Sequence, residues 1–341
     1  MWKLNKVGNS ILKQYAGEML GPLKNRLASN LSSSELNVLI PGYGSSNEDL
    51  SRLEGLLTDE PEALLIRNND LMSHLIKSYN ESDLADFQKA KRKSDNNRNT
   101  READLVNRYE ATLKKLLDAF GYKQSLSQDK DSSYRLVEMK GTNVCTYCNR
   151  QYIFTVNKPQ KKGLEHIVRP ELDHWYNKEL YPLMSLSFYN LIPSCQVCNS
   201  STKGSAVFSL ATHIHPYVQT DANPRIEFRP TVTTGHNSFY GVKIDRVAGS
   251  KEDNTVKAFA LDEIYAEHGR LEVEDLMQFN FAYNDGYLKV LFDELLDKFC
   301  PKMTKAEVYR MLFGTELAPE RFGERPMSKL KYDVLKYLHV I

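Results

Sequence analysis

Two segments, VCTYCNRQYIFTV at 144–156 and PELDHWYNKELYPLMSLSFYNLIPSCQVCNSSTKGS at 170–205, decide the fold in the middle of this chain. They contain four of its five cysteines as two C-x-x-C pairs, which are Cys145 with Cys148 and Cys195 with Cys198. Each C-x-x-C turn can aim two thiolates at one point, and two such turns supply the four sulfurs that Zn²⁺ prefers in a closed structural site. We therefore predict a structural zinc site at these four cysteines.

The segment between the two pairs is longer than in a simple zinc ribbon, and it carries polar residues of its own. Asp173 and His174 are expected on one strand, Asn190 on a second strand, and a helix is expected from Asn199 with Lys203 one turn later. Two strands followed by a helix form a ββα unit whose polar groups converge on its concave face. This pattern predicts a ββα-metal nuclease site.

Taken together, these residues resemble the HNH endonuclease family in its four-cysteine form, whose pattern is C-x-x-C, (E/L)-D-H, N-L, C-x-x-C-N and a lysine. The matching residues are Cys145, Cys148, Asp173, His174, Asn190, Leu191, Cys195, Cys198, Asn199 and Lys203. The resemblance covers roughly a fifth of the chain. It implies catalytic roles for His174, Asn190 and Lys203. His174 would be the general base and Asn190 would orient the hairpin that carries it, while Asp173 and Asn199 would bind a catalytic Mg²⁺ or Mn²⁺.

The chemistry of phosphodiester hydrolysis suits these residue types. A water must lose a proton as it attacks, and a neutral imidazole is suited to accept it. The departing 3′ oxygen needs positive charge, which a hard cation with oxygen ligands can supply. For Lys203 two interpretations remain open, because it either faces a phosphate or is a solvated surface lysine.

Other residues have interpretations without catalysis. The four cysteines alone would also suit a zinc ribbon that binds nucleic acid, with Asp173 and His174 as ordinary strand residues. His213 and His215 form an H-x-H pair, and on a strand their rings would share one face and could add a ligand or a phosphate contact; a structural or partly exposed role is the favoured interpretation. Cys300 is expected to be a buried thiol that acts as a small apolar residue.

Composition indicates an ordinary globular chain. The 341 residues are 41% hydrophobic and 26% charged, with a formal net charge of +1, so any basic surface that binds nucleic acid must be local. No run approaches the roughly 20 apolar residues of a membrane span, and the N-terminus does not resemble a secretion signal. We expect a cytoplasmic protein without membrane contact, in which paired cysteines favour metal over disulfides.

The predicted fold is α+β, with mainly helical N- and C-terminal regions around the ββα-metal core. The domain boundaries are placed at 1–124, 125–218 and 219–341. Apolar periodicity predicts helices over 11–31, 61–80 and 103–120, with a bend or break at Gly21-Pro22, Pro61 in a first turn and Gly121 as a C-terminal cap. A polar linker is expected at 124–135. Alternating residues predict strands over 224–249, and further helices follow, one of them capped by Thr304.

The segment 86–108 is the most basic tract of the chain. Its basic residues outnumber the nearby acids and are Lys89, Lys91, Arg92, Lys93, Arg98 and Arg101. Two interpretations remain open, because such a tract can bind a phosphate backbone or form a solvated surface.

The order of the parts, and the phrases LDHWYNKELYPLMSLSFYNLIPSCQVCN and IHPY, also resemble HNH effectors of prokaryotic anti-phage defence, such as nuclease subunits of Septu-type and retron systems. This resemblance implies a separate ATPase subunit as partner, since the chain has no phosphate-binding loop of its own. DNA is the expected substrate, RNA is the alternative, and a homodimer is compatible with cleavage of both strands.

Overall fold

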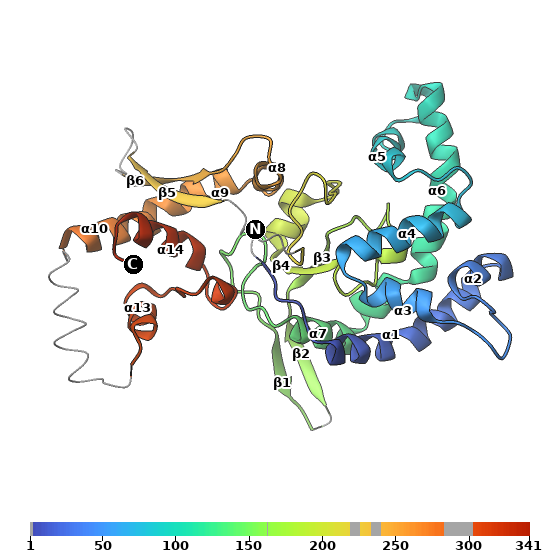
Figure 1. The fold of residues 1–341 in the computed structure, drawn as a ribbon, viewed down its shortest axis with the longest axis horizontal. Coiled ribbons are helices and arrows are strands. Elements are labelled where there is room, and N and C mark those ends of the chain that lie inside the picture. Colours follow the sequence, from blue (N-terminus) through green and yellow to red (C-terminus); the bar gives the residue numbers. More distant parts are fainter. Residues whose placement is uncertain (1–2, 162, 219–225, 233–239, 283–302) are drawn as a thin grey trace.

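The computed structural model describes residues 3–161, 163–218, 226–232, 240–282 and 303–341. The chain is elongated, with one group of helices at its N-terminal end, small sheets in the middle and a second helical group at the C-terminal end (Figure 1). The fold is thus α+β, as predicted from the sequence. None of the helices in these ranges has the length and apolar character needed to span a membrane.

Seven α-helices form the N-terminal group: α1 (Asn9–Asn30), α2 (Ser33–Leu39), α3 (Ser51–Thr58), α4 (Pro61–Leu75), α5 (Leu84–Lys91), α6 (Thr100–Phe120) and α7 (Lys130–Lys140). The predicted helix ends at Pro61 and Gly121 are confirmed. Pro61 occupies the first turn of α4, where its missing N–H costs nothing. Gly121 ends α6 in the left-handed region at φ 60°.

Two local predictions in this region are wrong. Helix α1 continues through Pro22 without a break, because Met19, Leu23 and Leu27 on one face are buried and hold both halves against the core. The expected linker at 124–135 is helical instead, with a π-helix at Lys123–Gln128 followed by α7. Its few apolar side chains are deeply buried, and that packing outweighs the polar composition.

The middle of the chain contains two antiparallel hairpins. They are β1 (Val156–Pro159) with β2 (Leu164–Val168) and β3 (Glu171–His174) with β4 (Leu191–Ser194). In the second hairpin Asp173 pairs with Ile192 and His174 with Leu191. A π-helix, η5 (Val197–Lys203), follows β4 and packs on β3. Two strands and a helix therefore occur in the predicted order, although the helix is a π-helix rather than an α-helix.

The C-terminal group packs on a third antiparallel hairpin. Its elements are β5 (Glu227–Val232), β6 (Tyr240–Asp245), α8 (Lys251–Ala258), α9 (Leu261–His268), the π-helix η6 (Gly269–Val273), α10 (Glu274–Ala282), α13 (Lys305–Phe313) and α14 (Ser328–Tyr337). Helix α14 packs against β5, and α9 packs against β6. The predicted strands and the Thr304 cap are confirmed, and Thr304 and Glu307 form a reciprocal capping box.

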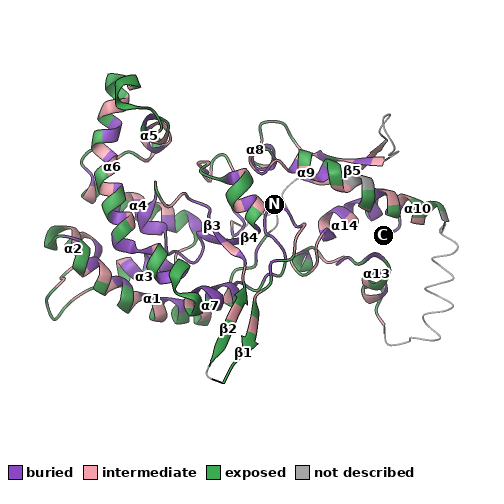
Figure 2. Ribbon diagram, turned by 180° about the vertical axis from the view of Figure 1, so that it is seen from behind, coloured by how far each residue is buried: buried purple, intermediate pink, exposed green. Residues whose placement is uncertain are grey.

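The connection between β3 and β4 is the buried centre that joins the N-terminal helices to the second hairpin (Figure 2). The Tyr15 hydroxyl of α1 donates a hydrogen bond of 2.7 Å to the Leu186 carbonyl. The backbone N–H of Phe188 donates to the carbonyl of Leu57 in α3 at 2.8 Å. These contacts fix the connection, and with it the hairpin that carries Asp173 and His174.

Candidate functional site

The four cysteines predicted to bind zinc lie together. All four are free thiols, are buried, and have sulfur atoms within 4.8 Å of one another, with 3.9 Å between those of Cys148 and Cys195. Four sulfurs at the corners of a tetrahedron, each about 2.3 Å from Zn²⁺, would be about 3.8 Å apart. The cluster therefore fits a metal such as zinc, and Cys145, Cys148, Cys195 and Cys198 are the residues that would hold it.

The first cysteine turn is bonded to the C-terminal group. Asn149, which follows Cys148 in the left-handed region, donates through Nδ2 to the carbonyl of Phe322 at 2.7 Å and accepts through Oδ1 from the N–H of Lys329 at 3.2 Å. The Tyr265 hydroxyl donates to the carbonyl of Cys148. The turn that would bind metal thus joins the middle of the chain to α9 and to the start of α14.

Asp173 lies next to the cysteine cluster and is 3% exposed. Its carboxylate accepts hydrogen bonds from the Lys203 ammonium at 2.9 and 2.8 Å and from the hydroxyl of Tyr147, the residue between Thr146 and Cys148. Lys203 also donates to the backbone carbonyl of His174. Lys203 is 4% exposed, so it is not a solvated surface lysine.

His174 is held in one orientation by two neighbours. Its Nε2 lies 2.9 Å from the carbonyl of Ser185, and the ring packs edge-on against Tyr122, with 4.3 Å between the ring centroids. A carbonyl can only accept, so Nε2 carries the hydrogen and Nδ1 is the basic nitrogen of the neutral ring. Burial lowers the pKa of His174 from 6.5 to about 3, with smaller contributions from the charges of Lys178 and Lys203.

Acid should destabilise the protein through His174. The unfolded ring binds a proton near pH 6.5 and the folded ring only near pH 3. Above about pH 6.5 the ring is neutral in both states, and the free energy of unfolding is not reduced by this residue. As the pH falls from 6.5 toward 3, the unfolded state gains a proton that the folded state does not, so the free energy of unfolding decreases. The loss is at most about 5 kcal/mol. Urea unfolding of the wild type and of His174→Gln, which keeps an N–H for Ser185, measures it across this range. The free energy of unfolding should fall more steeply with acid in the wild type. Parallel curves would contradict a buried neutral ring.

Asn190, expected on the second strand, lies one residue before β4. It is fully buried, and both polar atoms of its amide form hydrogen bonds across the β3–β4 connection. Its Oδ1 accepts from the N–H of Tyr176 at 2.6 Å, and its Nδ2 donates to the carbonyls of Tyr176 at 3.1 Å and Met184 at 3.0 Å. These bonds fix the backbone just after His174 and just before Ser185, the partner of its ring.

Asn199 and Glu171 form a polar pair at the edge of the site. Asn199 donates through Nδ2 to a carboxylate oxygen of Glu171 at 2.8 Å, and the Ser200 hydroxyl donates to the same oxygen at 3.1 Å. Glu171 and Tyr147 were not recognised as candidate residues in the sequence. The only signal for either was its place in the motif, because Glu171 starts the strand of Asp173 and Tyr147 lies inside the first C-x-x-C.

The site residues open onto a cavity of about 250 Å³, which we call the His174 hollow. Asp173, His174, Asn199 and Lys203 line it from the second hairpin and η5, and Tyr122 and Lys178 line it from the segment after α6 and from the β3–β4 connection. The structure thus brings the predicted residues Asp173, His174, Asn199 and Lys203 together around one space. Asn190 does not line the cavity, and it acts through its hydrogen bonds to Tyr176 and Met184.

The residues predicted to bind a catalytic Mg²⁺ or Mn²⁺ do not fit a hard cation as they are arranged. Both carboxylate oxygens of Asp173 already contact the ammonium of Lys203, and one contacts Tyr147. Within the described ranges, the four cysteines are the one group of His, Cys, Asp or Glu side chains arranged to hold a metal. A catalytic metal at Asp173 and Asn199 remains a prediction.

His213 and His215 lie outside the His174 hollow. His215 is buried, its Nδ1 accepts from the N–H of Tyr217 at 3.2 Å, and its ring lies 4.5 Å from that of Trp175. His213 stacks on Phe208 with 4.1 Å between centroids. Both rings belong to a packed aromatic cluster, in line with the structural interpretation. Cys300 lies outside the described residues.

The basic tract at 86–108 is largely neutralised by acids, most of them within the tract and one, Glu179, in the β3–β4 connection. Of the six basic residues singled out from the sequence, five form ion pairs within 4 Å: Lys89, Lys91, Lys93, Arg98 and Arg101. The sixth, Arg92, donates to the hydroxyl of Ser205 at 2.5 Å, and Ser205 lines the His174 hollow. Most of this tract is therefore a paired surface, and one arginine reaches the rim of the site.

Comparison with known proteins adds no identification to this geometry. No protein family model, no curated protein and no solved structure matches the chain. The resemblance to HNH endonucleases therefore rests on the motif residues of this chain, and it remains a prediction.

Proposed function

We propose that this protein is an HNH-type endonuclease that hydrolyses phosphodiester bonds of DNA and that a structural zinc holds its core. The observation that carries the proposal is the arrangement of His174. Its Nε2 is bonded to the Ser185 carbonyl, which leaves Nδ1 as the base in a ring that lines a polar cavity beside Lys203 and Asn199. A lone zinc ribbon needs no such histidine.

In the proposed reaction, Nδ1 of His174 accepts a proton from water while the water oxygen bonds to phosphorus. The bond from phosphorus to the 3′ oxygen breaks, and that oxygen takes a proton from solvent. The low pKa of His174 keeps the ring neutral and ready as a base at pH 7. Burial is the main cause of this low pKa, and the negative charge of a bound phosphate would raise the pKa from that value.

In this proposal Lys203 lines the cavity beside the reacting phosphate as the ion-pair partner of Asp173, which balances its charge and is itself held by the Tyr147 hydroxyl. A divalent cation at Asp173 would have to displace the ammonium of Lys203, so we assign no step to such a cation. Whether cleavage requires Mg²⁺ or Mn²⁺ is an outcome of the test below.

The test is nicking of a supercoiled plasmid by the wild type and by His174→Gln, each with Mg²⁺, Mn²⁺ or EDTA. Because glutamine keeps an N–H for Ser185 but has no basic nitrogen, we expect cleavage at least 100-fold slower with unchanged zinc content and unfolding temperature. His74→Gln, an exposed histidine of α4 outside the hollow, is the matched control and should cleave at the wild-type rate.

Full activity of His174→Gln would remove His174 from the mechanism. Cleavage of RNA in place of DNA would identify the RNA-cleaving alternative. A zinc adaptor without catalysis would instead retain its cellular activity when Asp173, His174 and Asn199 are replaced together. The role in anti-phage defence beside a partner ATPase is also a proposal, and co-purification of neighbouring gene products tests it.

A further inference from the structure

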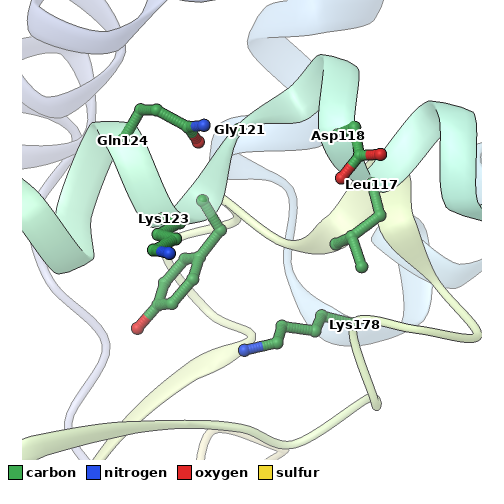
Figure 3. A pocket seen from close by; sticks show the side chains of 7 residues that line it. Leu117, Asp118, Gly121, Lys123, Gln124 and Lys178 are labelled. Atoms are coloured by element: carbon green, nitrogen blue, oxygen red, sulfur yellow. The ribbon is translucent and has the colours of Figure 1, made fainter.

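A second cavity adjoins the His174 hollow. It measures about 260 Å³ and shares Tyr122 and Lys178 with the first, so these two side chains form the wall between them. Lys123 and Gln124 of the π-helix after α6 line one side of it, and Lys178 from the β3–β4 connection lines another (Figure 3). We call it the Lys123 hollow. The two cavities are therefore adjacent, and the segment after α6 lines both of them through Tyr122.

Lys178 carries a charge that no described carboxylate neutralises at contact distance. Its Nζ lies 4.9 Å from the centre of the Tyr122 ring, a cation–π contact, and it forms no ion pair within 4 Å in the described ranges. Partial burial lowers its pKa. Holding an ammonium half-buried without a counter-ion is unfavourable unless an anion binds there.

Lys123 is exposed at the first position of the π-helix and also lacks an ion pair with any residue that the structure describes. The lack of an ion pair with a described residue at Lys123 and Lys178 contrasts with the tract at 86–108, where five of the six basic residues singled out form ion pairs with carboxylates. Two ammonium groups without an ion pair among the described residues, those of Lys123 and Lys178, thus line the Lys123 hollow. Asp118, which also lines the Lys123 hollow, is the one carboxylate in that lining.

We propose that Lys123 and Lys178, on the two sides of the Lys123 hollow, bind the phosphate next to the one cleaved, with Tyr122 as the wall between the two phosphates. The proposal deepens the nuclease function above and rests on it. It identifies the substrate as a polynucleotide that extends beyond the scissile bond toward α6, and it gives the N-terminal helices a direct part in binding. Phosphate contacts of this kind position a strand without reading its sequence.

Binding of a short fluorescein-labelled DNA duplex, followed by fluorescence anisotropy, tests this subsite. All variants carry His174→Gln, so that the probe is not cut. Relative to this background, Lys123→Gln with Lys178→Gln should weaken binding roughly tenfold to fiftyfold. It should also make the slope of log K against log salt shallower by about 1, since both lysines contact one phosphate and a lost phosphate contact removes about 0.9. Lys336→Gln, an exposed lysine of α14 outside both hollows, should change the Kd less than about twofold.

The outcomes separate the two proposals. Unchanged affinity and salt slope in the double variant, together with His174-dependent cleavage by the wild type, would overturn the subsite and leave the nuclease in place. Lysine-dependent binding without any cleavage by the wild type would support the subsite and overturn the nuclease. If the double variant binds labelled RNA more weakly and no variant binds labelled DNA, the subsite would be supported and the substrate would be RNA instead of DNA. Absence of binding to both probes would overturn the subsite and the proposed nuclease together.

Discussion

Cys148→Ser is expected to yield a protein that lacks zinc and has lost the folded structure of its middle region. Metal binding at a structural four-cysteine site contributes on the order of 10–16 kcal/mol, which is as large as the whole stability of a typical domain. Cys148 is fully buried, and the turn that contains it is bonded to Tyr265 and, through Asn149, to Phe322 and Lys329. Loss of the metal should therefore also loosen the C-terminal group.

Zinc content per chain, thermal unfolding and limited proteolysis measure this result. A strong chelator added to the wild type should reproduce the effect of the substitution without any change of sequence. Cys300→Ser serves as the comparison, because Cys300 belongs to neither C-x-x-C pair and about one zinc per chain should remain. A soluble Cys148→Ser protein that keeps its zinc and its unfolding temperature would contradict the four-sulfur site.

Asn190→Ala should have the largest effect on stability of any single substitution outside the cysteines that we consider. It removes three hydrogen bonds and leaves the N–H and the carbonyl of Tyr176 without these partners in a fully buried place, while the Met184 carbonyl still accepts from the N–H of Ser187. Each such unpaired group costs about 1–3 kcal/mol, so we expect a loss of roughly 2–6 kcal/mol in the free energy of unfolding. The remaining folded protein should also cleave more slowly, since the Ser185 carbonyl that orients His174 is no longer fixed.

Urea unfolding of Asn190→Ala measures the first effect. Asn37→Ala is a suitable control, because Asn37 is exposed on α2 and its side chain bonds only to the Ser33 carbonyl one turn earlier. That variant should differ from the wild type by less than about 0.5 kcal/mol. A similar small change for Asn190→Ala would mean that the connection between β3 and β4 does not depend on this side chain.

Much of this arrangement could be predicted from the sequence because its signals are local. The C-x-x-C spacing identified the four sulfurs, and caps such as Pro61, Gly121 and Thr304 marked helix ends. These signals depend on neighbouring residues, which the sequence displays directly. The convergence of Asp173, His174, Asn199 and Lys203 could also be anticipated, because the motif sets their order on two strands and a helix.

The parts that could not be predicted depend on contacts between distant residues. The Tyr147 hydroxyl meets Asp173 across 26 positions of sequence, and Tyr122 reaches His174 from the helical region. Helix α7 was missed because its polar composition hides the side chains that packing buries. The burial of Lys203 is another such case, since a lysine one turn after Asn199 is compatible with either surface or interior until the neighbouring elements are placed.

The bond from Asn149 to Phe322 has a consequence for genetics. The segment from Phe322 through α14 supplies partners for both polar atoms of the Asn149 side chain, directly beside Cys148 of the four-cysteine cluster. A stop codon or frameshift before Phe322 would spare every motif residue and still remove these partners. Such alleles should behave as null alleles, and a fusion in which another sequence replaces this segment should inactivate the protein in the same way.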